Sequence, residues 1–255
     1  GDINGNNRTY ASWNWKAGNS QGSSNTDGAL NTTYTSVNTT AGFSISSYTG
    51  TGNATTVGHG LGAVPKMIIV KRLDAVKNWQ VYHGSLAANE AIELNGTGGK
   101  YTAGNRWNST APTNTVFTIG SADEVNPSGG TVVAYCFAEK TGYSKFGSYV
   151  GNNNADGAFI YTGFKPAFVI IKRSSAGENW SLYDNKRLGY NPQSLMLRPN
   201  TSDVEGSYAT SDSIDFVSNG FKIRTSGTAL NDGTYIYMAI GQSLVGTNNV
   251  PCTAR

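Results

Sequence analysis

An internal repeat is the feature of this sequence that most constrains the fold. Residues 48–83 align without a gap on residues 149–184, which lie 101 positions further along the chain. A match of this length at constant spacing predicts two copies of one structural unit. The shared residues include Pro65/Pro166, Lys71/Lys172, Arg72/Arg173, Trp79/Trp180 and Tyr82/Tyr183.

The same similarity marks where each unit ends. Residues 116–139 resemble residues 220–242, with Asn and Gly before a final apolar run, and residues 4–18 resemble these closing segments. We therefore expect the chain to be the C-terminal part of a longer array, in which Tyr10–Lys16 joins a neighbouring sheet or packs against a partner chain. The expected segments are the closing strand of a preceding repeat (1–17), a first repeat (18–141), a second repeat (142–246) and a C-terminal tail (247–255).

Composition predicts that the unit is built from β-strands. Gly, Asn, Thr and Ser are plentiful and charged residues are only 14% of the chain, a mixture that suits short strands joined by tight turns. In the first closing segment Val133, Tyr135 and Phe137 alternate with smaller residues, which is the period of a strand with one buried face. The predicted fold class is all-β, with tandem antiparallel β-sandwich repeats of jelly-roll or lectin-like type.

The opening part of each unit is predicted to contain a β-hairpin. Met67–Arg72 forms one strand and Trp79–Tyr82 the returning strand, and four consecutive apolar residues indicate burial on both faces of the first strand. The Lys–Arg pair then marks where the strand leaves the core, with both charged groups in solvent. Trp79 and its counterpart Trp180 are expected to be core anchors rather than binding platforms.

Charge and cysteine content narrow the classes of partner. The net charge is +3 without any run of Lys or Arg, so we expect no nucleic-acid partner. No stretch of about eighteen apolar residues occurs, so no membrane insertion is expected. Cys136 and Cys252 lie far apart and fit neither a disulfide framework nor a thiolate zinc site. Cys136 is predicted to be a packed or partly exposed thiol rather than a nucleophile.

Few motifs suggest catalysis or a cofactor. Asp203 and Glu205 are close in sequence but lack the aromatic surround of a glycosidase cleft. The Gly-rich segment 95–100 lacks the Ser or Thr of a phosphate loop and is interpreted as a turn. The segment 152–157 could offer oxygen ligands to calcium, but its spacing fits no EF-hand and a turn is the simpler interpretation. We predict a non-enzymatic protein without cofactor or metal.

Positions where the two copies differ are the candidates for ligand binding, because shared residues belong to the scaffold. The only two histidines, His59 and His83, are aligned with Ile160 and Asp184 in the second copy. A Ser-His-acid site would need one of these histidines. The candidate residues are His59, His83 and Asp184, together with Tyr190 and Tyr208 in the polar insertion of the second copy.

The second copy contains a Gly-Phe-x-Pro segment, an apolar strand that ends in Lys and Arg, a Tyr-Asp pair and a Ser-Asn-Gly-Phe segment. This pattern resembles a repeat found in tail-fibre proteins of phages, especially phages of marine bacteria. The first copy departs from that pattern at His83, which replaces the Asp, and the second closing segment lacks the tryptophans. The resemblance implies a location on the virion surface, outside the cell, host attachment and a threefold homo-oligomer. It rests on Gly163, Phe164, Pro166, Lys172, Arg173, Tyr183, Asp184, Ser218, Asn219, Gly220 and Phe221, with Tyr10, Trp13 and Trp15 as the aromatic closing segment.

The function expected from these observations is structural and adhesive. The chain would be a segment of a virion tail fibre whose loops contact a host cell-surface glycan or protein, through weak contacts multiplied by avidity. Two alternatives remain open, a structural fibre spacer without ligand binding and a secreted carbohydrate-binding module of an enzyme.

Overall fold

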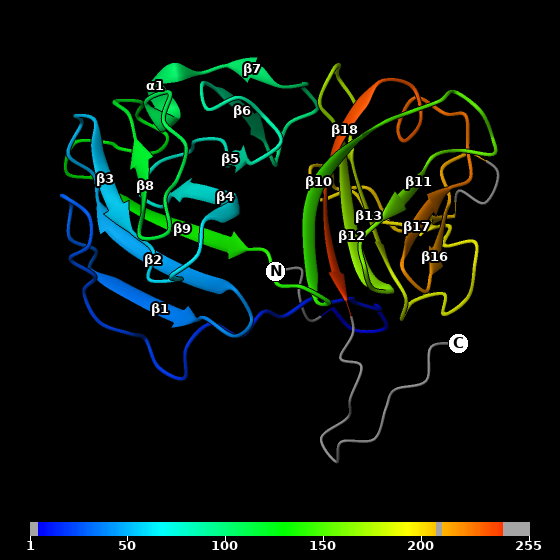
Figure 1. The fold of residues 1–255 in the computed structure, drawn as a ribbon, viewed down its shortest axis with the longest axis horizontal. Coiled ribbons are helices and arrows are strands. Elements are labelled where there is room, and N and C mark those ends of the chain that lie inside the picture. Colours follow the sequence, from blue (N-terminus) through cyan, green and yellow to red (C-terminus); the bar gives the residue numbers. More distant parts are fainter. Residues whose placement is uncertain (1–4, 208–210, 242–255) are drawn as a thin grey trace.

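The computed structural model describes residues 5–207 and 211–241, and in this part the protein is all-β, as the sequence predicts (Figure 1). The strands form several antiparallel sheets, and α1 (Gly104–Trp107) is the one helix in the described residues. No helix in that part of the chain has the length and apolar character needed to cross a bilayer. Residues 18–141 are called the first half below, and residues 142–241 the second half.

The first half holds two sheets around one core. Its strands are β1 (Tyr34–Asn38), β2 (Phe43–Thr49), β3 (Thr55–Gly58), β4 (Pro65–Arg72), β5 (Gln80–His83), β6 (Glu90–Glu93), β7 (Tyr101–Thr102), β8 (Val116–Ile119) and β9 (Thr131–Ala138). The large sheet has the order β1-β2-β9-β4-β5-β6-β7, and β3 pairs with β8 in a small sheet. Buried side chains of both sheets, among them Tyr48, Ile68 and Phe117, form the core of this half.

The second half is also built around one core. Its strands are β10 (Ser144–Val150), β11 (Phe159–Tyr161), β12 (Pro166–Arg173), β13 (Trp180–Asp184), β14 (Leu195–Met196), β15 (Gly206–Ser207), β16 (Ile214–Val217), β17 (Gly220–Ile223) and β18 (Thr234–Gly241). They form the sheets β10-β18-β12-β13, β11-β17-β16 and β14-β15. The core between the first two sheets includes Tyr149, Tyr183 and Phe221.

The main sheets of the two halves have the same order of pairing. The order β2-β9-β4-β5 corresponds to β10-β18-β12-β13, and in each half the strand that starts at the shared proline has a register shift at its beginning. His83 lies opposite Met67, and Asp184 lies opposite Phe168. At this hairpin, residues that align in sequence therefore occupy the same position in the sheet.

One buried Tyr and one buried Asn close the loops of each half. Tyr48 and Tyr149 each donate a hydrogen bond of 2.7 Å from the phenol to a backbone carbonyl. Asn126 and Asn231 are 0% exposed, and each donates through its amide to two backbone carbonyls. The acceptors are Val125 and Leu230 for the tyrosines, Asn53 and Gly120 for Asn126, and Asn154 and Thr225 for Asn231.

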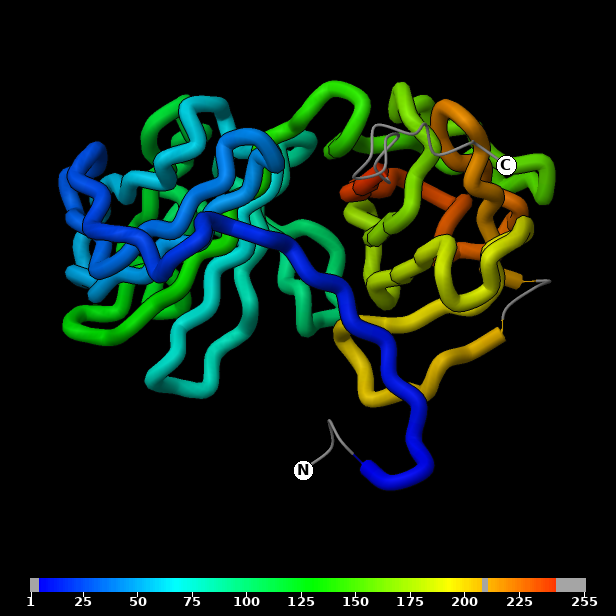
Figure 2. The backbone as a smooth tube through the Cα atoms, turned by 90° about the horizontal axis from the view of Figure 1, so that it is seen from below, coloured from blue at the N-terminus to red at the C-terminus, as the bar shows by residue number. Residues whose placement is uncertain are grey.

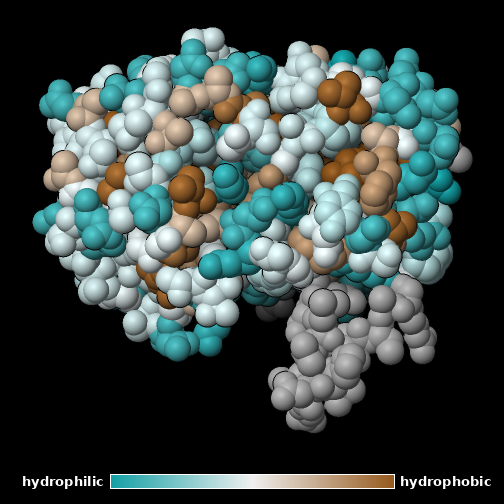
Figure 3. Space-filling model, in the orientation of Figure 1, coloured by the Kyte–Doolittle hydropathy of each residue, from teal (hydrophilic) through white to brown (hydrophobic). Residues whose placement is uncertain are grey.

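A third core lies between the two halves, which stand side by side in Figure 1 and are in contact in the space-filling view of the same side (Figure 3). It is formed by the outer faces of the two main sheets, and burial of this much apolar surface favours a fixed arrangement of the halves. The buried members are Phe43, Met67, Val81, Leu86, Ile92 and Phe137 from the first half, and Phe146, Phe168, Ile170, Trp180, Leu182, Ile236, Met238 and Ile240 from the second. We refer to this core as the seam.

The N-terminal segment does not form the expected strand. Residues 5–17, which are called the N-terminal segment throughout, have no strand partner within the described chain. They run across both halves beneath the seam (Figure 2). Trp13 and Trp15 pack edge-on against Phe168, with ring centroids 6.0 and 5.3 Å away, and Trp15 also contacts Phe137. In each half the closing strand occupies a central place in its sheet, and β9 and β18 already fill both places, so this segment covers the seam instead.

The prediction that both charged groups of the Lys–Arg pair lie in solvent holds only in part for the first half, where Lys71 is partly exposed and its Nζ donates a hydrogen bond of 2.6 Å to the carbonyl of Lys77. It is wrong for Lys172 in the second half. Lys172 is 0% exposed at the seam, where its Nζ donates hydrogen bonds of 3.1 Å to the carbonyl of Thr97 and 3.0 Å to that of Arg173. Burial lowers the pKa of Lys172 to about 8. The tryptophans also differ, because Trp180 is buried as expected whereas Trp79 is only half-buried. The first half covers one copy of this face and nothing in the described chain covers the other.

Candidate ligand-binding groove

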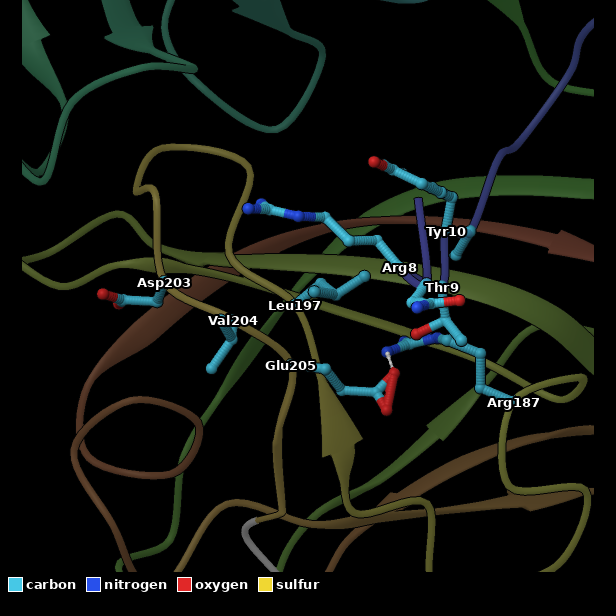
Figure 4. Close-up of a pocket in the computed structure, with 10 residues that line it drawn as sticks. Arg8, Thr9, Tyr10, Arg187, Leu197, Asp203, Val204 and Glu205 are labelled. Carbon is cyan, nitrogen blue, oxygen red and sulfur yellow. Dashed lines mark hydrogen bonds and ion pairs between the residues drawn. The ribbon is translucent and has the colours of Figure 1, made fainter. Parts of the chain in front are cut away.

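A large hollow lies between the N-terminal segment and the second half. It has a volume of about 800 Å³, and Figure 4 shows side chains from both segments facing it. The tip of the N-terminal segment forms one wall, and the loop before β15 forms the other. The lining residues are Asn7, Arg8, Thr9, Tyr10, Ala11, Arg187, Leu197, Asp203, Val204 and Glu205.

Arg187 is the central charged group of this hollow. Its Nε lies 2.6 Å from Oδ2 of Asp184 and its Nη1 lies 3.0 Å from Oε1 of Glu205. The guanidinium also stands 5.8 Å from the ring centroid of Trp13, a cation–π distance. These contacts hold Arg187 in one orientation between two carboxylates.

Asp184 is kept ionised by its surroundings. Burial opposes the charged form, but hydrogen bonds from Arg187 and from the backbone N–H groups of Lys186 and Arg187 keep the pKa of Asp184 below its ordinary value. A general acid at neutral pH would require a raised pKa. Asp184 is therefore a fixed hydrogen-bond acceptor that orients Arg187.

A second hollow continues the first one past Arg187. It has a volume of about 390 Å³ and shares Tyr10, Ala11 and Arg187 with the larger hollow. Trp13 and Phe168 add aromatic surface here. Tyr10 is 51% exposed, and its phenol oxygen accepts a hydrogen bond from the backbone N–H of Gly5. Together the two hollows, called the groove below, offer aromatic faces beside fixed charged donors and acceptors, which suits a polyhydroxylated ligand.

His59 belongs to the first half and does not line the groove. It is 0% exposed, its Nε2 lies 3.2 Å from the carbonyl of Thr113, and its Nδ1 accepts a hydrogen bond from the N–H of Leu61. Burial lowers its pKa, so the ring is neutral and secures two loops. Its sequence match to Ile160 does not hold in space, because Ile160 faces Phe221 in the ladder as Val57 faces Phe117.

His83 is buried at the seam rather than exposed to a ligand. Its Nδ1 accepts a hydrogen bond from the N–H of Ser85, so Nε2 carries the proton and donates to the carbonyl of Tyr237 at 3.1 Å. Burial lowers the pKa of His83 to about 4. At this shared position Asp184 orients Arg187 in the second half, whereas His83 joins the first half to the second.

The remaining candidates are divided between two places. Asp184 lines the groove, whereas Tyr190 is 67% exposed at a separate hollow of about 330 Å³ that also contains Lys165 and Gln193. Tyr208 lies outside the described residues. Of the four predicted residues that the structure describes, only Asp184 lines the groove.

Sequence reasoning missed most of the groove. Arg187 follows Asp184 by three residues, where the first half has the apolar Leu86 three residues after His83. This paired change was visible in the sequence and distinguishes the second half. Tyr10 had no comparable signal, because its place in the groove depends on the path of the N-terminal segment.

Comparison with known proteins places the chain in one family. Residues 1–243 match the family described as a domain of unknown function, DUF7483. No curated protein matches the chain, and no solved structure does. The family match spans the N-terminal segment and both halves without interruption, which agrees with the contacts that join these parts at the seam. The chain therefore belongs to the DUF7483 family.

Proposed function

We propose that this protein is a non-enzymatic adhesive module that binds a glycan of a host cell surface in the groove. The observation that carries the proposal is the grouping of Tyr10 and Trp13 around Arg187, whose guanidinium is fixed by two carboxylates. An exposed aromatic face stacks on the C–H face of a sugar ring. The Arg187 guanidinium and the partly exposed Glu205 carboxylate supply hydrogen bonds to the hydroxyls.

The setting proposed for this binding is a virion tail fibre outside the cell. The support is the likeness of the second copy to tail-fibre repeats described above. A single groove gives weak binding, and the threefold homo-oligomer of the assembled fibre raises the effective concentration of neighbouring grooves once one groove is occupied. Attachment would therefore depend on the number of linked copies more than on one tight site.

The finer architecture we propose is a pair of tandem β-sandwich units of jelly-roll or lectin-like type. Its support is that both halves have a four-strand order in common, and that equivalent Tyr and Asn side chains close their loops. The unequal additions include β1 in one half, and β16 and the segment that carries Arg187 in the other. In this view the shared residues maintain the scaffold and the additions carry binding.

Binding to a glycan array by multivalently displayed chains tests the glycan proposal. We expect Tyr10→Ala and Glu205→Gln each to lower the affinity for a bound glycan by about tenfold or more. Tyr34→Ala is the matched control, because Tyr34 is 41% exposed on the edge strand β1, away from the groove. If no glycan is bound by the displayed chain, or if the groove variants bind like the control, the adhesive assignment fails.

A rigid structural spacer is the second candidate function. The seam favours it, because a core of buried aromatic and aliphatic residues ties the two halves together without using the groove. A spacer would leave every glycan unbound while keeping the assembly of the fibre. The array experiment therefore separates the two functions directly.

A further inference from the structure

A loop of the first half covers the tryptophan face of the second half. The indole Nε1 of Trp180 donates a hydrogen bond of 2.9 Å to the carbonyl of Glu93. Two further bonds of 3.1 and 2.8 Å run to the carbonyl of Thr97, from Nζ of Lys172 and from the N–H of Glu178. The loop 93–99 is therefore the covering loop of this contact, whose carbonyls accept hydrogen bonds from the face around Trp180, called the receiving face.

The equivalent face of the first half is present but uncovered. Trp79 is half-buried and stacks on Tyr135 at 6.4 Å, and Nζ of Lys71 lies 5.9 Å from the Trp79 ring centroid. A hollow of about 490 Å³ opens beside the stacked rings. Every residue that lines this hollow belongs to the first half, from the β4–β5 hairpin and from Val133 and Tyr135 of β9.

The second half also has its own copy of the covering loop. In the first half, Oδ1 of Asn95 accepts a hydrogen bond of 2.8 Å from the backbone N–H of Trp79, and Nδ2 of Asn95 donates one of 2.9 Å to Oδ1 of Asn78. In the second half, Asn200 accepts the N–H of Trp180 at 3.0 Å and donates to the corresponding Asn179 at 2.7 Å. The loop around Asn200 thus occupies the place of the loop around Asn95.

This correspondence assigns a backbone carbonyl of the second half to each hydrogen-bond donor of the Trp79 face. Glu93, whose carbonyl accepts the hydrogen bond from the Trp180 indole, lies two residues before Asn95. Arg198 lies two residues before Asn200, so its carbonyl is the counterpart of the Glu93 carbonyl. By the same spacing Ser202 is the counterpart of Thr97, and it is exposed. Residues 198–202 correspond to residues 93–97 of the loop that covers Trp180, and Asn200 anchors them as Asn95 anchors that loop.

The contact between the halves is head-to-tail, because the covering loop and the receiving face are different surfaces of the unit. A head-to-tail contact does not close between two units. The first half therefore keeps an unused receiving face, and the second half keeps an unused covering loop. We propose that the Trp79 face binds the loop 198–202 of a second copy of this chain. Copies joined in this way repeat the arrangement of the halves along a row, and the proposal does not depend on glycan binding.

Sedimentation velocity of the chain over a wide range of concentration tests this interface. We expect the wild type to associate reversibly and Trp79→Glu to sediment as a monomer, since the substitution removes the indole that the loop would cover and puts a charged group in its place. Ser202→Arg is expected to do the same, because it adds bulk and a positive charge that faces Lys71. Tyr161→Glu, at a 64% exposed aromatic on β11, is the matched control and keeps the association.

A mixing experiment gives the sharper result. Trp79→Glu retains an intact loop and Ser202→Arg retains an intact face, so an equimolar mixture is expected to form a heterodimer and nothing larger. Near-ultraviolet circular dichroism of each variant checks that it is folded, and Lys71→Glu replaces Trp79→Glu if that variant unfolds. A monomeric wild type at every concentration, unchanged association of the face variant, or a mixture that stays monomeric would overturn the proposal.

Discussion

The imidazole of His83 and the backbone carbonyl of Tyr237 form a hydrogen bond of 3.1 Å that joins β5 of the first half to β18 of the second. The bond lies beside the seam, where side chains from both main sheets are buried together. Because a buried polar group without a partner is costly, this bond favours one register between the halves. The halves are therefore coupled by packing and by specific polar contacts.

Acid should weaken the protein through His83. Its pKa in the folded protein is about 4, against an ordinary value of 6.5, so the unfolded chain takes up a proton first as the pH falls. The stability that depends on neutral His83 is present above pH 6.5 and is lost toward pH 4, a loss on the order of 3 kcal/mol. Urea unfolding at several pH values measures it, and His83→Gln should flatten the slope in this window. Equal slopes for the variant and the wild type would contradict the prediction.

Alkaline pH should act in the opposite sense through Lys172. Its pKa is about 8 in the folded protein against an ordinary 10.5, so the unfolded chain holds its proton longer as the pH rises. The free energy of unfolding therefore increases between about pH 8 and pH 10 through this group. Guanidinium unfolding of wild type and Lys172→Met measures the difference in slope. Equal slopes for Lys172→Met and the wild type would contradict the prediction.

Replacing either loop-closing asparagine should destabilise the protein. Asn126→Ala removes an amide that donates to two backbone carbonyls and accepts the N–H of Thr51, leaving buried polar groups unpaired. We expect a loss of about 2–4 kcal/mol, and a similar loss for Asn231→Ala. Thermal and urea unfolding measure both variants, with Asn114→Ala at an exposed loop position as the control. A loss no larger than that of the control would show that these loops are closed by other contacts.

The N-terminal segment should contribute to stability even though it forms no strand. Trp15 packs edge-on against Phe137 and Phe168, one residue from each half. Trp15→Ala should lower the free energy of unfolding by about 2 kcal/mol, since the residue is only half-buried. Its exposed neighbour supplies the control, Asn14→Ala. An unaltered unfolding midpoint in Trp15→Ala would mean that the segment is not held at the seam.

Much of the fold follows from local patterns in the sequence. The alternation around Val133, Tyr135 and Phe137 predicts β9, and the constant spacing between the copies predicts that Met67 and Phe168 stand at the same place in their sheets. These features depend on strand period and on short-range turns, which neighbouring residues determine. The Asn before each closing strand was also visible, although its hydrogen bonds were not.

What covers each face was decided only by the tertiary structure. The apolar run of β12 predicts burial on both sides, but it does not say that the loop 93–99 provides one side and thereby buries Lys172. Equal sequences around Trp79 and Trp180 lead to unequal burial for the same reason. The groove likewise exists because the N-terminal segment crosses the seam beside Arg187. Periodicity assigns residues to a face of their own strand, whereas the occupant of that face comes from distant parts of the chain through packing.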